Sequence, residues 1–132
     1  MGLDMDGYTM NAEFVGDRQT DVNVSEDERE EAALNHFAYW RKFNHLHGWM
    51  ENLYRQKGGK AEVFNCCTVR LELEDLDRLE SDLNEEKLEY TPGFFFGNDE
   101  IYPEDITETK TFIANARLAI AEGRAVFYDS WW

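Results

Sequence analysis

The segment between Ser25 and Gly59 constrains the fold of this chain more than any other part of the sequence. It begins with the run 25–28, Ser-Glu-Asp-Glu, which is the pattern of a helix capping box with acids at the positive helix end. It ends with the run 57–59, Lys-Gly-Gly, a cation followed by a glycine stop. One helical face lies between these signals, with apolar residues at 4-3-4-3 spacing: Tyr39, Phe43, Leu46, Met50 and Leu53. The segment therefore predicts one long helix over residues 26–57.

A neighbouring row of the same helix mixes aromatic and polar side chains. Trp40, Asn44 and His47 share this row, Arg41 and Trp49 flank it, and His45 falls on a third row that we expect to face water. Aromatic rings can stack on a flat ligand while an amide, an imidazole and a cation bond its polar edge. The candidate ligand-binding residues are therefore Trp40, Arg41, Asn44, His47 and Trp49. The alternative is that these residues pack in the core, with Asn44 and His47 bonding backbone groups.

The remaining elements follow from local patterns. We expect strands within residues 1–16, 63–71, 94–96 and 125–132, an acidic helix carrying Leu76, Leu79 and Leu83, and a helix from Pro103 to Gly123. These elements predict a single α+β domain over residues 1–132. Its small, mainly antiparallel sheet should pack against one long helix and two shorter ones.

The charge of the chain restricts its partners. The 28 acidic residues against 13 basic ones give a net charge of −15, which disfavours direct binding to nucleic acid or anionic lipid and favours basic partners. No apolar run reaches the length of a membrane helix, and the first residues lack the pattern of a signal peptide, so we expect a cytosolic protein. The oligomeric state stays open.

The acidic helix suggests an alternative function. Carboxylates spaced like the phosphates of nucleic acid could occupy the basic groove of a nucleic-acid-binding protein. Such runs also occur as solvated faces that keep a protein soluble. The candidate acidic surface comprises Glu74, Asp75, Asp77 and Glu80.

Catalytic and metal-binding patterns are sparse. On one helix His45 and His47 diverge by about 200°, so the two imidazoles cannot hold one metal ion. A small hydrolase-type enzyme would need Cys66 or Cys67 as nucleophile and His47 as base, and neither cysteine has a helix-start context that would lower its pKa. We therefore predict no metal, no cofactor and a non-enzymatic role, with the hydrolase as a further alternative.

Four motifs occur here in a characteristic order: MGLDM at residues 1–5, WRKxNxxHxW at 40–49, GFFFG at 93–97 and FYxSW at 127–131. The chain resembles a family of short, functionally uncharacterised bacteriophage and prophage proteins that carry these motifs over nearly their full length. It departs from that pattern at Asp6, where an aromatic residue is usual, and at His45, where a small residue is usual.

The resemblance implies a setting, the cytoplasm of an infected bacterial host, in which small phage proteins commonly disable a host factor or sequester a host signal. The leading prediction is non-enzymatic binding of a host protein or of a small, aromatic, anionic, nucleotide-like host metabolite. The binding surface would be the mixed helix face.

Overall fold

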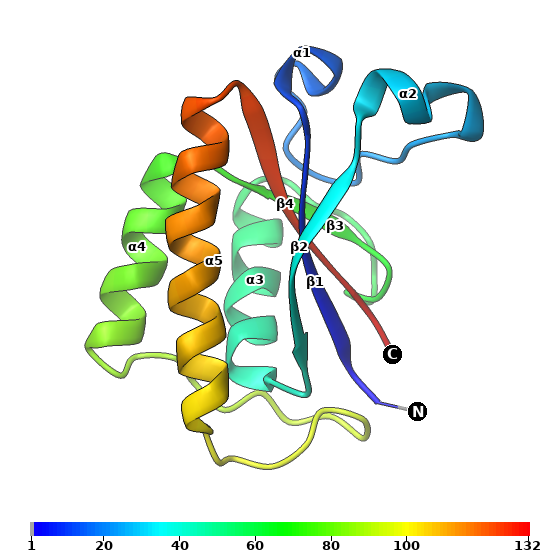
Figure 1. Ribbon diagram of the computed structural model, residues 1–132. Helices are drawn as coiled ribbons and strands as arrows, with labels where there is room; N and C mark the ends of the chain where they lie inside the picture. Colours follow the sequence, from blue (N-terminus) through cyan, green and yellow to red (C-terminus); the bar gives the residue numbers. More distant parts are fainter. Residues whose placement is uncertain (1) are drawn as a thin grey trace.

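The strand β1 (Asp4–Asn11) organises the fold in the computed structural model, which describes residues 2–132 (Figure 1). β2 (Asn35–Arg41) pairs with one side of β1 and β4 (Arg124–Trp131) with the other, while β3 (Thr68–Leu71) pairs with β4. Every pairing is antiparallel, and the order across the sheet is β2-β1-β4-β3. The small antiparallel sheet predicted from the sequence is confirmed.

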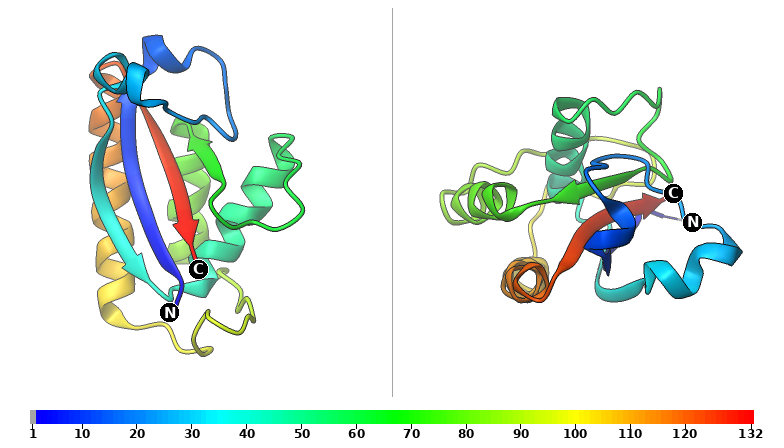
Figure 2. Two further views of the ribbon diagram at one scale, coloured as in Figure 1. Left: turned by 90° about the vertical axis from the view of Figure 1, so that its right-hand side faces the viewer. Right: turned by 90° about the horizontal axis from the view of Figure 1, so that it is seen from above.

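The helices divide between the two faces of this sheet (Figures 1 and 2). The larger core holds three helices: α3 (Asn44–Gln56), α4 (Leu73–Asn84) and α5 (Pro103–Ala121). The upper part of the other face is covered by short elements: α1 (Ala12–Val15), a 3₁₀ turn (Glu26–Glu28) and α2 (Arg29–Ala32). The α+β fold class is confirmed. No helix within residues 2–132 is long and apolar enough to cross a lipid bilayer.

Side chains of β1 alternate between two cores, because successive residues of a strand point to opposite faces. Met5 packs in the larger core, whereas Tyr8 and Met10 pack in a smaller cluster on the opposite face. Gly7 lies against Phe112 of α5 so closely that a β-carbon there would come within 2.7 Å of the ring. The glycine therefore lets the longest helix approach the middle of the sheet.

The predicted long helix over residues 26–57 is wrong. Its first turns form only the 3₁₀ turn and α2, which ends at Ala33 in the left-handed region (φ 49°). The chain then forms β2, and a second left-handed residue, Lys42 (φ 58°), turns it into α3. The buried Ala38 and Trp40 alternate with half-buried or exposed neighbours. Pairing with β1 overrides the helical spacing that Tyr39 and Trp40 also satisfy. The capping box at Ser25 is present.

Three other elements form where the sequence predicts them. The acidic helix is α4, the helix that begins with Pro103 at its first position is α5, and the carboxy-terminal strand is β4. Gly123, with φ 84°, follows α5 and allows the sharp turn into β4. These three predictions are confirmed.

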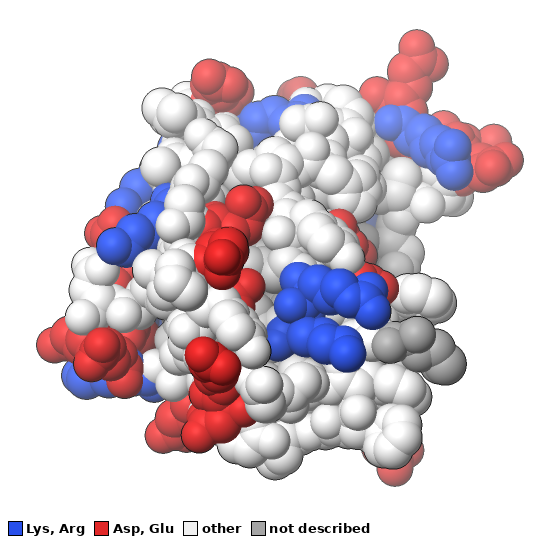
Figure 3. Space-filling view, turned by 60° about the horizontal axis from the view of Figure 1, so that its bottom comes forward, with Lys and Arg blue, Asp and Glu red and all other residues white. Residues whose placement is uncertain are grey.

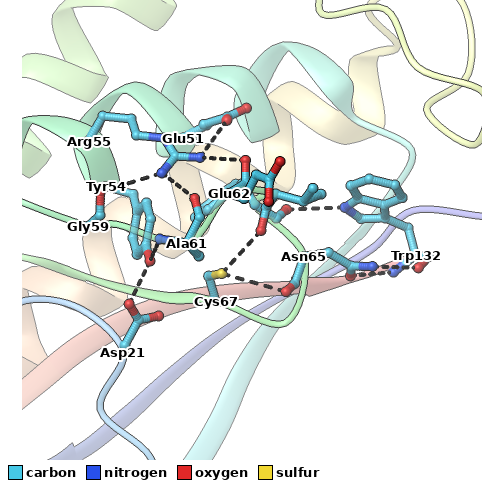
Figure 4. Close-up of polar contacts among 12 residues, drawn as sticks. Asp21, Glu51, Tyr54, Arg55, Gly59, Ala61, Glu62, Asn65, Cys67 and Trp132 are labelled. Carbon is cyan, nitrogen blue, oxygen red and sulfur yellow. Dashed lines mark hydrogen bonds and ion pairs between the residues drawn. The ribbon is translucent and has the colours of Figure 1, made fainter.

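The strand predicted over residues 63–71 forms only as β3 over its last four residues. Side chains hold the preceding segment, as Figure 4 shows. Arg55 donates to the carbonyl groups of Gly59, Ala61 and Glu62, and Asn65 exchanges two hydrogen bonds with the backbone of Trp132 at 2.8 and 3.1 Å. The segment is thus fixed to α3 and to Trp132. One backbone hydrogen bond, from Cys66 to Ser130 at 2.9 Å, joins it to β4, but no strand forms before Thr68.

The strand predicted at residues 94–96 is also wrong, because this segment is an irregular turn. Phe94 is 95% exposed, whereas Phe96 is buried against His47 and Trp132. Leu3 donates its backbone N–H to the carbonyl of Phe95 at 3.1 Å. A single hydrogen bond therefore joins the turn to the start of β1, in place of a strand pairing.

Candidate functional site

The five predicted ligand-binding residues do not share one helix face. Trp40 and Arg41 end β2, whereas Asn44, His47 and Trp49 lie in α3. Asn44 and His47 are at most 1% exposed, Trp40 is 2% exposed, and Arg41 is exposed. The row that the sequence suggested is therefore divided between the core and the surface.

Trp40 packs inside the larger core. Its indole N–H donates to Oγ1 of Thr109 at 3.0 Å, and its ring meets the edge of Phe112. Arg41 lies outside and donates to the Asp4 carboxylate at 3.1 Å. His45, which we expected to face water, is buried at 3% exposure beside Phe43, so that prediction is wrong.

Asn44 joins α3 to the segment that follows α4. Its side-chain amide donates to the carbonyl oxygens of Phe96 and Asn98 at 2.9 and 2.8 Å, and its oxygen accepts the backbone N–H of Thr91 at 3.0 Å. These three bonds use the amide's two N–H groups and one lone pair of its oxygen. Asn44 therefore acts as a clamp between distant parts of the chain.

His47 has an apolar environment. Its Nδ1 lies 2.7 Å from the hydroxyl of Tyr128, and the rings of Phe64 and Phe96 pack against it. Burial lowers the pKa of His47 to about 4, because the charged imidazolium loses its hydration there. The imidazole is therefore neutral at pH 7.

The four sequence motifs meet at one end of the molecule. Leu3 of the first motif accepts the N–H of Lys42 at 2.8 Å and donates to Phe95 of the third. Asn44 of the second motif also reaches the third, and its His47 reaches Tyr128 of the fourth. The motifs thus form one interlocked set of contacts.

Trp49, one of the five predicted ligand-binding residues, lines a sizeable depression. This depression lies between α3 and α4 and has a volume of about 420 Å³. The segment that follows α4 closes it at one end. We call it the α3–α4 groove, and its residues are Gly48, Trp49, Glu51, Asn52, Leu53, Gln56, Arg78, Asp82, Lys87, Glu89, Tyr90 and Thr91. Its volume lies within the range of small-molecule sites, which is about 300 to 1,000 Å³.

Contacts from α4 orient the Trp49 ring. The indole N–H donates to Asp82 Oδ2 at 2.9 Å, and the Arg78 guanidinium lies 5.6 Å from the ring centre. Gly48 brings α3 against the segment at Thr91, where any β-carbon would collide with the threonine side chain. The wall of the groove is therefore fixed by two elements distant in sequence.

The mouth of the groove carries polar groups suited to a ligand. Asn52 and Gln56 are exposed one helical turn apart, and Tyr90 is 45% exposed. Arg78 and Lys87 supply cations. Sequence reasoning missed these residues, although the spacing of Asn52 and Gln56 (i, i+4) was a visible signal.

The candidate acidic surface is largely neutralised by neighbouring cations. Asp75 is buried, lying 2.6 Å from Lys57 Nζ and 3.6 Å from Arg78. Asp77 and Glu80 both pair with Arg117, at 2.8 and 3.1 Å, while Glu74 is exposed. On the side that Figure 3 shows, acidic side chains form several separate groups with basic ones between them.

Side chains able to hold a metal ion do not gather within residues 2–132. No three His, Cys, Asp or Glu side chains there could hold a metal ion together. Cys66 is exposed and Cys67 is buried, and both are free thiols. Burial raises the pKa of the Cys67 thiol, so the thiolate is disfavoured.

Comparisons with protein-family models, with curated proteins and with solved structures find no match for this chain.

Proposed function

We propose that this protein acts by binding, without catalysis, and that the α3–α4 groove takes a small planar ligand of nucleoside size. One observation carries the proposal: the groove combines a fixed tryptophan with exposed amides and cations in about 420 Å³. A ring can stack beside Trp49 and Tyr90 while Asn52 and Gln56 bond its polar edge. We keep Trp49 as a ligand-binding residue, but the residues that we propose to bind the ligand with it are those of the α3–α4 groove.

The charge of the groove defines the ligand more closely. Its residues include three acids, Glu51, Asp82 and Glu89, against the two cations Arg78 and Lys87, and the chain as a whole carries −15. Such a field repels a polyphosphate more strongly than a single phosphate, and it does not oppose a neutral ligand. We propose a nucleoside or nucleoside monophosphate in preference to a triphosphate.

The four motifs support a bacteriophage origin, so the ligand we propose is one that occurs in the cytoplasm of an infected bacterium. Acidic mimicry of nucleic acid has less support. A mimic needs free carboxylates, and three of its four candidate residues pair with Lys57, Arg78 or Arg117.

Removing the side-chain amide of Asn52 should show whether the ligand binds in the groove or at the predicted residues in the core. We expect isothermal titration calorimetry with nucleosides and nucleoside monophosphates to give saturable heats, and Asn52→Ala to weaken binding about tenfold. That factor corresponds to about 1.4 kcal/mol, the size of one lost hydrogen bond. Asn52 is exposed and its side chain makes no hydrogen bond within residues 2–132, so the fold should be unaffected.

The matched control is Asn115→Ala, which removes an exposed amide from α5 outside the groove. It should bind like the unaltered protein. Absence of heat with every nucleoside and monophosphate would refute the proposal, as would equal affinities of the two variants.

A further inference from the structure

The two outer strands of the sheet differ in what covers their free sides. β3 is covered, because Asp21 donates its N–H to the carbonyl of Thr68 at 3.0 Å and Arg70 donates to Gln19 at 2.8 Å. β2 pairs with β1 alone among the residues that the structure describes. The outer side of β2 therefore offers backbone groups that no other strand uses (Figure 2).

One hydrogen bond shows which residues of β2 point outward. The N–H of Tyr39 donates to Glu108 Oε1 on α5 at 3.3 Å, so it faces away from β1. Alternate residues of an antiparallel strand share a direction, which places the backbone groups of Arg41 on the same side. The carbonyl of Tyr39 faces outward too. The carboxylate of Glu108 accepts the Tyr39 N–H, as the backbone carbonyl of an added strand would.

A shallow hollow of about 450 Å³ follows this edge. Phe37 and Ala38 form its apolar part, and the carboxylates of Asp6 and Glu108 stand on either side, with His36 and Tyr39 completing it. No lysine or arginine lines it. The hollow is therefore complementary to an extended segment with positive side chains.

The sheet face beside the hollow strengthens this preference. Asp6 lies opposite Asp129 across β1 and β4, and both carboxylates are half-buried. Burial raises the pKa of Asp6 and of Asp129. His36, whose Nδ1 lies 3.9 Å from Asp6, lowers the pKa of both groups, whereas Asp4 raises that of Asp6 and Asp6 raises that of Asp129. A lysine or arginine side chain placed here would offset the cost of burying these carboxylates and their mutual repulsion more fully than His36 does alone.

We propose that an extended basic segment of a partner protein adds to the free edge of β2 as a fifth strand, with lysine or arginine side chains beside Asp6 and Glu108. Strand addition supplies affinity through the backbone and specificity through alternate side chains. A second copy of this chain fits less well, because each copy carries −15 and would oppose its own carboxylates. The surface shares no residue with the α3–α4 groove and does not depend on ligand binding there.

The test uses a labelled synthetic peptide in which lysine and valine alternate, followed by fluorescence anisotropy with the full chain. We expect the peptide to bind, and a version methylated on alternate backbone nitrogens to bind at least about tenfold more weakly, because it keeps its charge but loses strand hydrogen bonds. Asp6→Asn with Glu108→Gln should also weaken binding. Glu13→Gln with Glu74→Gln, which changes charge equally at exposed positions elsewhere, should weaken it less.

On the protein side, Tyr39→Pro removes the outward N–H, and proline is tolerated at a strand edge. Its expected effect is loss of peptide binding with β1 pairing retained. Equal binding of the methylated peptide would mean attraction by charge alone and would overturn the proposal, whether or not the proline variant folds. A dimer in analytical ultracentrifugation that Tyr39→Pro abolishes would assign the edge to a second copy, and would also overturn it.

Discussion

Replacing Asn44 by alanine should lower the free energy of unfolding by about 3 kcal/mol, since it removes three hydrogen bonds of about 1 kcal/mol each. The side chain is fully buried, and its partners at Thr91, Phe96 and Asn98 belong to the segment that connects α4 to α5. Alanine would leave these backbone groups without their partner. Chemical denaturation followed by circular dichroism measures the change.

Two further variants test this interpretation. Asn44→Asp should be at least as unstable at pH 7, because a carboxylate would face the carbonyl oxygens of Phe96 and Asn98. Asn52→Ala, which removes an exposed amide from the same helix, should change stability by less than about 0.5 kcal/mol. If Asn44→Ala were as stable as Asn52→Ala, the clamp would be refuted and a direct role in ligand binding would regain support.

Elements with strong local signals could be predicted from the sequence. α4 has leucines at helical spacing, and α5 has Pro103 at its start and Gly123 after its end. Such signals act within one element, so they do not depend on the rest of the fold. The antiparallel character of the sheet followed from these elements and the short strands around them.

The segment 35–41 could not be assigned in this way. Its aromatic residues fit two neighbouring rows of a helix, but aromatic residues also suit a strand that is buried on one side. β1, about thirty residues earlier in the chain, decides between the two by pairing with it. The exposure of Tyr39 shows that the strand forms and the helix does not: its side chain is 51% exposed, whereas the helical spacing placed it in the core.

The candidate site shows the same limit. Trp49 could be selected from its residue type, but its neighbours Arg78 and Tyr90 come from other elements. The polar character of Asn44 and His47 suggested a ligand, whereas their partners are Phe96 and Tyr128 of the same chain. Residue type indicates that a polar group needs a partner, and only the fold determines which partner it finds.

His47 and Asp129 should have opposite effects on acid stability. The pKa of His47 is lowered from 6.5 to about 4, so the unfolded chain takes up this proton first and stability falls as pH decreases from about 7 to 4. At about 1.4 kcal/mol per pKa unit, the full loss is about 3 kcal/mol. Burial raises the pKa of Asp129 from 3.8 to about 6, so here the folded protein takes up the proton first and stability rises over the same range.

Solvent screening reduces the contribution of the half-buried Asp129 to about 1 to 2 kcal/mol. Asp129→Asn should therefore be more stable than the unaltered protein at pH 7, and it should lose more stability between pH 7 and 4. His47→Gln should lose less over that interval, whatever its stability at pH 7. Asp17→Asn, at an exposed carboxyl group, should follow the unaltered protein within about 0.5 kcal/mol.

Urea denaturation at pH 7, 5.5 and 4 gives these differences directly, and comparing variants cancels the titration of groups that do not interact with the replaced residue. If His47→Gln lost as much stability as the unaltered protein on acidification, the imidazole would not be held neutral in the core. The apolar environment formed by Phe64 and Phe96 would then not be the cause of its lowered pKa. If Asp129→Asn were less stable at pH 7, the carboxylate would have a stabilising partner and the preference of this sheet face for a basic segment would lose its electrostatic support.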